Sequence, residues 1–259
     1  LRIQSLSRLI ADDHQPAAAI TDTNNMFGAL EFAQTLIGVG IQPIMGTQLN
    51  LEDMQGQGEV VLLAQTDRGY TNLSKLLSKT LLEADAVHDP SCSLDDLETH
   101  AEGLILLSGG ALAGFLGAPA GDGRPALAAA RADRLAAIFG DRFYIELQRH
   151  GLGVESTAEP HLLEIADRLN LPLVATNDCR FESAVMSQPH DTLVCIGNGR
   201  KFSETNRPRF SPEHYFKNAS QMSELFQDIP ESISNTLVIA KRCSTMARQR
   251  DPILPHFES

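Results

Sequence analysis

Residues 16–25 read PAAAITDTNN and residues 171–178 read LPLVATND, two apolar runs that each end in a polar cluster. A short, continuous apolar run is typical of a strand that is buried on both faces of a sheet. The polar residues then lie at the carboxyl end of the strand, where barrels and open α/β sheets carry ligands and chemistry. The two stretches therefore predict an α/β fold and place its site near residues 21–25 and 176–178.

Strand-like and helix-like patterns alternate along the chain. With the two runs above, taken as strands 16–21 and 171–176, the pattern predicts strands 42–49, 60–64, 104–107 and 143–148 and helices 3–10, 26–37, 70–83, 94–100, 126–139 and 157–169. Six strands that alternate with helices imply parallel β/α units. The turn-rich residues 53–58 also allow strands 42–49 and 60–64 to pair as a hairpin. Residues 114–125 are rich in Gly, Ala and Pro and are predicted to form a loop.

The character of the sequence changes after about residue 186. A polar loop over 200–212 is followed by DIPE at 228–231, which predicts a capped helix start with Pro at its first position. We expect residues 1–186 to form the β/α barrel core. We expect residues 187–259 to form a C-terminal helical extension that leads into a further domain.

Composition limits the classes of function. A hydrophobic fraction of 42% and a charged fraction of 21% are ordinary for a globular protein, and a net charge of −12 argues against a surface that grips phosphate backbones. Arg200-Lys201 and Arg207-Pro208-Arg209 allow a local basic patch, although solvated loop charge is the favoured interpretation. The scattered cysteines and the absence of a signal peptide or an apolar span indicate a reduced, cytoplasmic protein with no membrane segment and no zinc ribbon.

Several segments in a fixed order carry a resemblance to a known family. They are TDTNNMFGALEF at 21–32, GIQPIMG at 40–46, GYTNL at 69–73, EGLILLSGG at 102–110, ATND at 175–178, and ELF, IPE, NT and AKRC between 224 and 243. With these the chain resembles, over essentially its whole length, the N-terminal PHP (polymerase and histidinol phosphatase) domain of the bacterial replicative DNA polymerase III alpha subunit. The resemblance implies a distorted (βα)7 barrel, whose first strand is expected before Leu1.

The resemblance also implies where a metal site would lie. Active members hold a cluster of about three metal ions in the barrel mouth and hydrolyse phosphoesters. The corresponding positions in this chain are Asp22, Thr23, Gln48, Glu59, His150, Asp178 and Arg180. The family has His at the positions of Thr23 and Arg180, an acidic residue at Gln48 and His near Glu59, and its His-x-His motif is expected before Leu1. Thr and Gln are poor ligands and Arg repels cations, so we predict a vestigial site without metal. Its weak remaining candidates are Asp22, His150 and Asp178.

Arg180 suggests a replacement for the lost metal charge. A guanidinium can bind a carboxylate through two parallel hydrogen bonds and neutralise charge that a metal once balanced. One hypothesis pairs Arg180 with Asp22, or with another mouth carboxylate such as Glu146, which would hold the mouth shut, and the other leaves Arg180 in solvent. The remaining histidines, His190 and His214 among them, show no metal-binding spacing and are expected at ordinary surface or partly buried positions.

The resemblance therefore implies a non-catalytic domain that acts in DNA replication. Its expected partners are the polymerase domain of the same protein and the proofreading exonuclease subunit. DNA binding, Mg²⁺ and nucleotidyl transfer would belong to the parent DNA-directed DNA polymerase, and no cofactor is expected here. The alternatives are an active metal-dependent phosphoesterase or 3′–5′ exonuclease, and a stand-alone α/β-barrel enzyme that acts on a small phosphate ester. The residues at positions 23, 48 and 180 argue against the first, and the absent start and abrupt end argue against the second.

Overall fold

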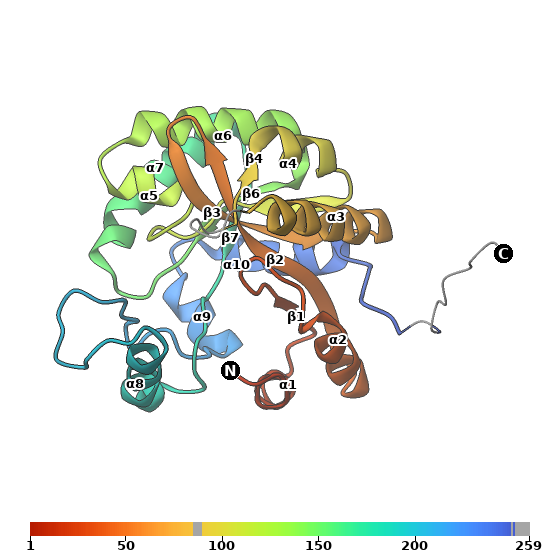
Figure 1. Ribbon diagram of the computed structural model, residues 1–259, viewed down its shortest axis with the longest axis vertical. Coiled ribbons are helices and arrows are strands. Elements are labelled where there is room, and N and C mark those ends of the chain that lie inside the picture. Colours follow the sequence, from red (N-terminus) through yellow and green to blue (C-terminus); the bar gives the residue numbers. More distant parts are fainter. Residues whose placement is uncertain (85–89, 250, 252–259) are drawn as a thin grey trace.

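The computed structural model describes residues 1–84, 90–249 and 251 (Figure 1). The strands are β1 (Ala17–Ile20), β2 (Gln42–Asp53), β3 (Gly56–Ala64), β4 (Cys92–Ser93), β5 (Leu104–Leu107), β6 (Phe143–Leu147) and β7 (Leu173–Ala175). The helices are α1 (Ile3–Asp12), α2 (Ala29–Gly38), α3 (Asp67–Glu83), α4 (Leu94–His100), α5 (Gly117–Gly121), α6 (Pro125–Phe139), α7 (Gly153–Leu169), α8 (Ser187–Gly197), α9 (Ala219–Leu225) and α10 (Pro230–Arg242). Short 3-10 turns lie at η1 (Gly140–Arg142) and η2 (Ala184–Met186). Each predicted strand and helix is confirmed, whereas residues 252–259 of the predicted extension lie outside the described residues.

Within the described residues the strands form one curled sheet in the order β1-β2-β3-β5-β6-β7, with β4 beside β2. The β1–β2, β5–β6 and β6–β7 pairs are parallel, but β3 is antiparallel to both β2 and β5. The prediction of parallel units throughout is therefore wrong at β3. Only residues 54 and 55 join β2 to β3, and so short a link can connect only antiparallel strands. The hairpin between these strands is confirmed.

Side chains of the sheet alternate between an inner and an outer face, as the two-residue period of a strand requires. The outer face packs under the surrounding helices, and Phe32, Leu73, Leu135 and Leu162 belong to this core. The inner face forms a second apolar cluster of Ile44, Val61, Leu63, Ile105, Leu107, Tyr144 and Val174. Along these strands, the inner-facing residues nearest the carboxyl ends of the parallel strands are polar. They are Gln48 on β2, Glu59 on β3, Glu146 on β6 and Thr176 directly after β7.

Helix α10 closes the opposite end of the sheet. Gln42, the first residue of β2, donates its Nε2 to the carbonyl oxygens of Ala240 at 2.7 Å and Cys243 at 2.6 Å. Asn235 donates to the carbonyl of Leu173 at 2.8 Å, at the start of β7. Cys243 is also buried within the inner apolar cluster. Because α10 fills the amino ends of the strands, the mouth at their carboxyl ends is the end available for a site.

A buried ion pair fixes the tip of the β2–β3 hairpin. Arg131 of α6 donates Nε and an Nη to the two carboxylate oxygens of Asp53, each at 2.8 Å. The same guanidinium donates to the carbonyl of Phe115 at 2.8 Å and lies 4.0 Å from the centroid of the Phe115 ring. Burial raises the pKa of Asp53, but the hydrogen bonds from Arg131 and from the amides of Gln55 and Gly56, together with the charge of Arg131, hold that pKa below its ordinary value. The hairpin is therefore tied to α6 through a bidentate contact.

Helix α3 approaches β5 so closely that only glycine fits at the contact. A Cβ atom on Gly69 would lie 1.8 Å from the carbonyl oxygen of Gly103, which itself has a φ of +75°. The Gly69 amide is the one that donates to the Thr66 hydroxyl, the N-cap of α3, at 3.2 Å. The first residue of the GYTNL segment is therefore a glycine at the point where the backbone of α3 touches the backbone of Gly103.

Three described helices lie outside the predicted set. Helix α5 forms inside the predicted loop 114–125 because it packs against α6 and α7, and Gly121 meets the side chain of Val154 there. Helix α9 begins with a capping box of Asn218 and Gln221, and α8 lies at the edge of the fold (Figure 1). No described helix combines the length and the apolar character needed to cross a bilayer.

Candidate functional site

Polar side chains meet at the mouth of the sheet. Burial raises the pKa of the Glu59 carboxyl; a hydrogen bond from Gln48 and the charge of Arg180 oppose this, and the charge of Asp178 adds to it. These interactions show that β2, β3 and the segment after β7 place Gln48, Glu59, Asp178 and Arg180 together. The common location follows from the strand ends, as the sequence predicted.

Arg180 is bound by the carboxylate of Asp178. Its Nε lies 2.8 Å from one carboxylate oxygen, and an Nη donates to the other at 2.8 Å. The guanidinium lies 4.8 Å from the centroid of the Phe210 ring, and the Arg180 amide donates to the His214 carbonyl at 2.7 Å. Arg180 is therefore paired with a mouth carboxylate, as one hypothesis held, but the partner is Asp178 and not Asp22 or Glu146. The hypothesis that leaves Arg180 in solvent is wrong. The loop before α9 holds the Arg180 guanidinium against Asp178, and 38% of the Arg180 side chain is exposed.

Glu146 of β6 is buried and is bound by neutral donors. Its carboxylate accepts hydrogen bonds from the Gly109 amide at 3.0 Å, from the Gln148 side chain at 3.1 Å and from the Thr176 hydroxyl. Burial raises the pKa of Glu146 in spite of these donors, and the charge of Asp178 acts in the same direction. Glu146 thus joins β6 to the ends of β5 and β7.

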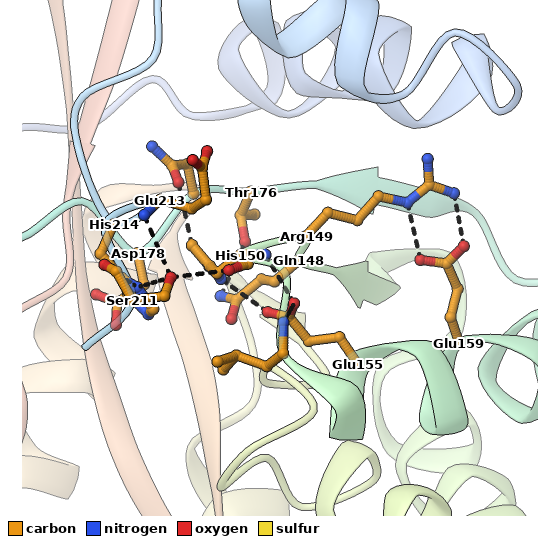
Figure 2. Close-up of polar contacts among 12 residues, drawn as sticks. Gln148, Arg149, His150, Glu155, Glu159, Thr176, Asp178, Ser211, Glu213 and His214 are labelled. Atoms are coloured by element: carbon orange, nitrogen blue, oxygen red, sulfur yellow. Dashed lines mark hydrogen bonds and ion pairs between the residues drawn. The ribbon is translucent and has the colours of Figure 1, made fainter. Parts of the chain in front are cut away.

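Both ring nitrogens of His150 have partners. Nδ1 lies 2.8 Å from a carboxylate oxygen of Glu155, and Nε2 lies 3.1 Å from Oδ1 of Asn177 (Figure 2). The other Glu155 oxygen accepts from the amides of His150 at 2.7 Å and Leu152 at 3.0 Å. Burial favours a higher pKa for Glu155, but these hydrogen bonds keep it below its ordinary value. His150 is therefore a buried structural group at the start of α7.

His214 lies on top of His150, and sequence reasoning missed it. The two rings are stacked with centroids 4.0 Å apart and planes 14° apart. Ser211 bridges them, because its hydroxyl donates to the His150 carbonyl at 2.8 Å and lies 3.0 Å from His214 Nδ1 (Figure 2). Burial, reinforced by His150, lowers the pKa of His214 to about 4. Residue spacing carried no signal for this contact, since it arises when the loop before α9 folds over the mouth.

Arg149 anchors the same segment from its outer side. Its guanidinium makes bidentate contacts with Glu159 of α7, at 2.6 and 2.9 Å, and with Asp228, at 2.7 and 2.8 Å. The hydrogen bonds from Asp228 and Glu159 raise the pKa of Arg149. Helix α10 begins at Pro230 as predicted, but no side chain caps it. Asp228 binds Arg149 instead.

Asp22 and Thr23 reach the mouth mainly through their backbone. The Asp22 carbonyl accepts from the Thr47 hydroxyl at 2.7 Å and the Gln48 amide at 3.2 Å, and Thr23 forms an isolated bridge with Gln48. The Asp22 carboxylate is directed toward Gly28, which precedes α2. In the described part of the chain, no ion pair involves Asp22. The structure therefore separates Asp22 from the Asp178–Arg180 pair.

These residues do not fit a catalytic metal cluster. Within residues 1–84, 90–249 and 251, no three His, Cys, Asp or Glu side chains are arranged to hold a metal ion. Arg180 places a cation beside Glu59 and Asp178, and His150 already uses both ring nitrogens. That the domain binds no metal remains a prediction, and its test is given below.

Comparisons with known proteins identify what the chain is similar to. A family model described as "PHP domain" matches residues 1–150. The chain is 41% identical to the DNA polymerase III subunit alpha of Caulobacter vibrioides, over 99% of this chain and 23% of that protein. It is 38% identical to the subunit of the same name from Rickettsia bellii and 38% identical to that from Pseudomonas aeruginosa, in each case over 99% of this chain and 22% of the relative. The chain thus spans less than a quarter of the length of these relatives.

Proposed function

The chain belongs to the PHP domain family, and from this premise we propose that it is the PHP domain of a DNA polymerase III alpha subunit and is not itself a hydrolase. In this proposal it supports the polymerase domain of the same protein during DNA replication and docks the proofreading exonuclease subunit. Its similarity to alpha subunits over 99% of its length supports the parent protein. The net charge of −12 favours protein partners over a DNA backbone.

The ion pair between Arg180 and Asp178 is the observation that carries the non-catalytic assignment. Metal-assisted phosphoester hydrolysis requires carboxylates and neutral imidazoles that converge on one point, where the metals bind water and the phosphate oxygens. Here a guanidinium binds Asp178 through two hydrogen bonds, and its charge opposes the rise in the pKa of Glu59 that burial causes. A divalent ion at this point would have to displace that guanidinium.

A supporting role is favoured by the way the chain leaves the barrel. After α10, the Ser244 amide donates to the Gln65 carbonyl at 3.0 Å and the Thr245 hydroxyl donates to Asp67. Thr245 and Ala247 are buried. The segment that follows the barrel is therefore attached to the end of β3 and the start of α3, so that the barrel could hold a neighbouring domain in place.

The non-catalytic assignment is tested by metal content and hydrolysis together. The domain is purified without chelator, analysed by elemental mass spectrometry, and assayed with bis(p-nitrophenyl) phosphate and with a 3′-labelled DNA strand in Mn²⁺ or Zn²⁺. We expect metal far below one equivalent and no hydrolysis above the buffer blank. About two or three equivalents, with hydrolysis that Asp178→Asn abolishes and Arg68→Met leaves intact, would instead establish the phosphoesterase or 3′–5′ exonuclease.

The docking role is tested by titrating the purified proofreading exonuclease subunit into the domain in a calorimeter. We expect a saturable complex of equal stoichiometry. Absence of heat and of co-elution on a sizing column would remove the docking role while leaving the family assignment intact.

A further inference from the structure

An apolar stripe runs along the outside of helix α8. Val185, Pro189, Leu193 and Ile196 recur at the helical spacing of three or four residues, and Val185, Leu193 and Ile196 are 83%, 66% and 72% exposed. The opposite side of the helix faces the protein, where Cys195 is buried. A stripe at this spacing normally packs against a core, whereas isolated exposed apolar residues are ordinary. The four residues together mark a helix face suited to a partner.

A cavity adjoins this stripe at Val185. It has a volume of about 420 Å³ and is lined by residues of η2 and α8 and by Phe202, Arg209, Phe210 and Pro212 of the following loop. The loop is held in place by Arg207, whose side chain is 2% exposed and which makes a bidentate ion pair with Asp191 of α8. The interpretation of Arg207 as solvated loop charge is therefore wrong. The cavity extends the apolar surface across the loop.

Two cations beside the cavity have no acidic partner among the described residues. Residues 182–217 carry five basic and four acidic side chains, in a chain with a net charge of −12. Asp191 is taken up by Arg207, Glu204 lies 3.4 Å from Arg200, and Glu213 lies 3.4 Å from Lys217. In the described structure Lys201, Arg209 and Glu182 take part in no ion pair. Lys201 and Arg209 thus form a cationic rim beside the apolar stripe, and Glu182 is the one acid of this segment outside the ion pairs described.

We propose that this region, which we call the α8 surface (Val185, Pro189, Leu193 and Ile196, the cavity beside Phe202, and the rim cations Lys201 and Arg209), docks an acidic amphipathic helix of a partner protein. The apolar side of such a helix would cover the stripe, and its carboxylates would face the rim. The stripe itself is aliphatic and Phe202 is the exposed aromatic side chain beside it, whereas single-stranded nucleic acid stacks successive bases on several aromatic side chains, which favours a protein. The inference deepens the proposed docking function by giving it a place and a chemistry.

The experiment uses fluorescein-labelled helical peptides of about four turns that share one leucine stripe and differ only in their polar residues, which are Glu, Lys or Gln. Anisotropy titrations with the 259-residue chain should show the Glu peptide binding about ten-fold more tightly than the Lys peptide. Leu193→Asp with Ile196→Asp should weaken the Glu peptide about ten-fold or more. Leu82→Asp is the matched control, because Leu82 is 85% exposed on α3, away from α8 (Figure 1).

A charge reversal separates the rim from the stripe. Lys201→Glu should weaken binding of the Glu peptide several-fold and leave the Gln peptide unchanged, while Lys75→Glu on α3 changes neither. Thermal melting of each variant verifies that it is folded, since all the replaced side chains are exposed or half-buried.

Three results would overturn the assignment. They are no binding of the Glu peptide to the unmodified chain, equal binding by the Leu193/Ile196 variant, and displacement of the peptide by oligothymidylate, which would assign the surface to single-stranded DNA. No replication subunit is present in these titrations. Their failure therefore removes the α8 surface alone, whereas the calorimetric test with the exonuclease subunit decides the proposed function.

Discussion

Replacing Arg180 with Met removes the cation at the mouth and keeps a side chain of similar length. The change deletes the two hydrogen bonds to Asp178 and the contact with the Phe210 ring. It also leaves the Asp178 and Glu59 carboxylates without the positive charge that both of them face. Arg180→Met therefore tests whether the guanidinium stabilises the mouth of the sheet.

The magnitude follows from the exposure of the pair. The side chains of Arg180 and Asp178 are 38% and 34% exposed, so solvent screens their attraction and the ion pair contributes at most about 1 kcal/mol. The guanidinium over Phe210 adds about 0.5 kcal/mol. The free energy of unfolding should fall by about 1.5 kcal/mol, which corresponds to a drop of roughly 3–6 °C in melting temperature for a domain of this size.

Urea denaturation followed by circular dichroism measures this loss, and a double-mutant cycle with Asp178→Asn isolates the pair. Arg180→Met and Asp178→Asn should together cost less than the sum of their separate effects. Arg68→Met is the matched control, because the Arg68–Glu102 pair is 69% and 66% exposed and should contribute little. If Arg180→Met leaves the free energy of unfolding unchanged, the guanidinium does not replace a stabilising cation and the reasoning fails.

Three further predictions concern stability. The pKa of His214 is about 4 in the folded state, against 6.5 ordinarily, so the unfolded state binds more protons between these two pH values. The free energy of unfolding should therefore fall by up to roughly 3 kcal/mol as the pH is lowered from 6.5 to 4. His214→Phe should remove this pH dependence, as measured by urea titrations at each pH. Arg131→Met strands a buried carboxylate and should cost about 3–5 kcal/mol in urea denaturation, and a variant as stable as the parent chain would contradict this. Gly69→Ala should lower the melting temperature, because the new methyl group meets the Gly103 carbonyl at a cost of about 1–3 kcal/mol, whereas Gly38→Ala, with no neighbour within 4 Å, should be neutral or stabilising by up to about 1 kcal/mol.

Local patterns were sufficient for most of the fold. The apolar runs that became β1, β5 and β7 and the periodic helices α3, α6 and α10 were predicted close to their observed bounds. Apolar residues recur along each of these segments at the spacing of a helix or as a short continuous run of a strand, so the pattern can be read from the local sequence. The expectation that the first run is buried on both faces was wrong, because β1 lies at the edge of the sheet and Ala19 is exposed. Helix α8 was not predicted, because its apolar residues lie on the exposed side and its sequence contains Pro189.

The candidate site was predicted in location and in composition but not in its contacts. Asp178 and Arg180 were singled out individually, and a pairing of Arg180 with a mouth carboxylate was predicted, but Asp22 and Glu146 were named as its partners instead of Asp178. The choice of partner depends on Phe210 and on the His214 carbonyl, which lie some 30 residues further along the chain and hold Arg180 in position. His214 itself gave no local signal.

By itself the sequence determined the α/β class, the strands whose carboxyl ends carry the polar cluster, and the family resemblance. These properties depend on short-range periodicity and on residue identity, and both can be read from a few neighbouring residues. Only the tertiary structure decided that β3 also pairs antiparallel with β5, that α10 fills the amino end of the sheet, that Arg180 binds Asp178, and that His150 is enclosed by Glu155, Asn177 and His214. Each of these depends on chain segments that are distant in sequence and become neighbours only when the core is buried, so no local pattern encodes them.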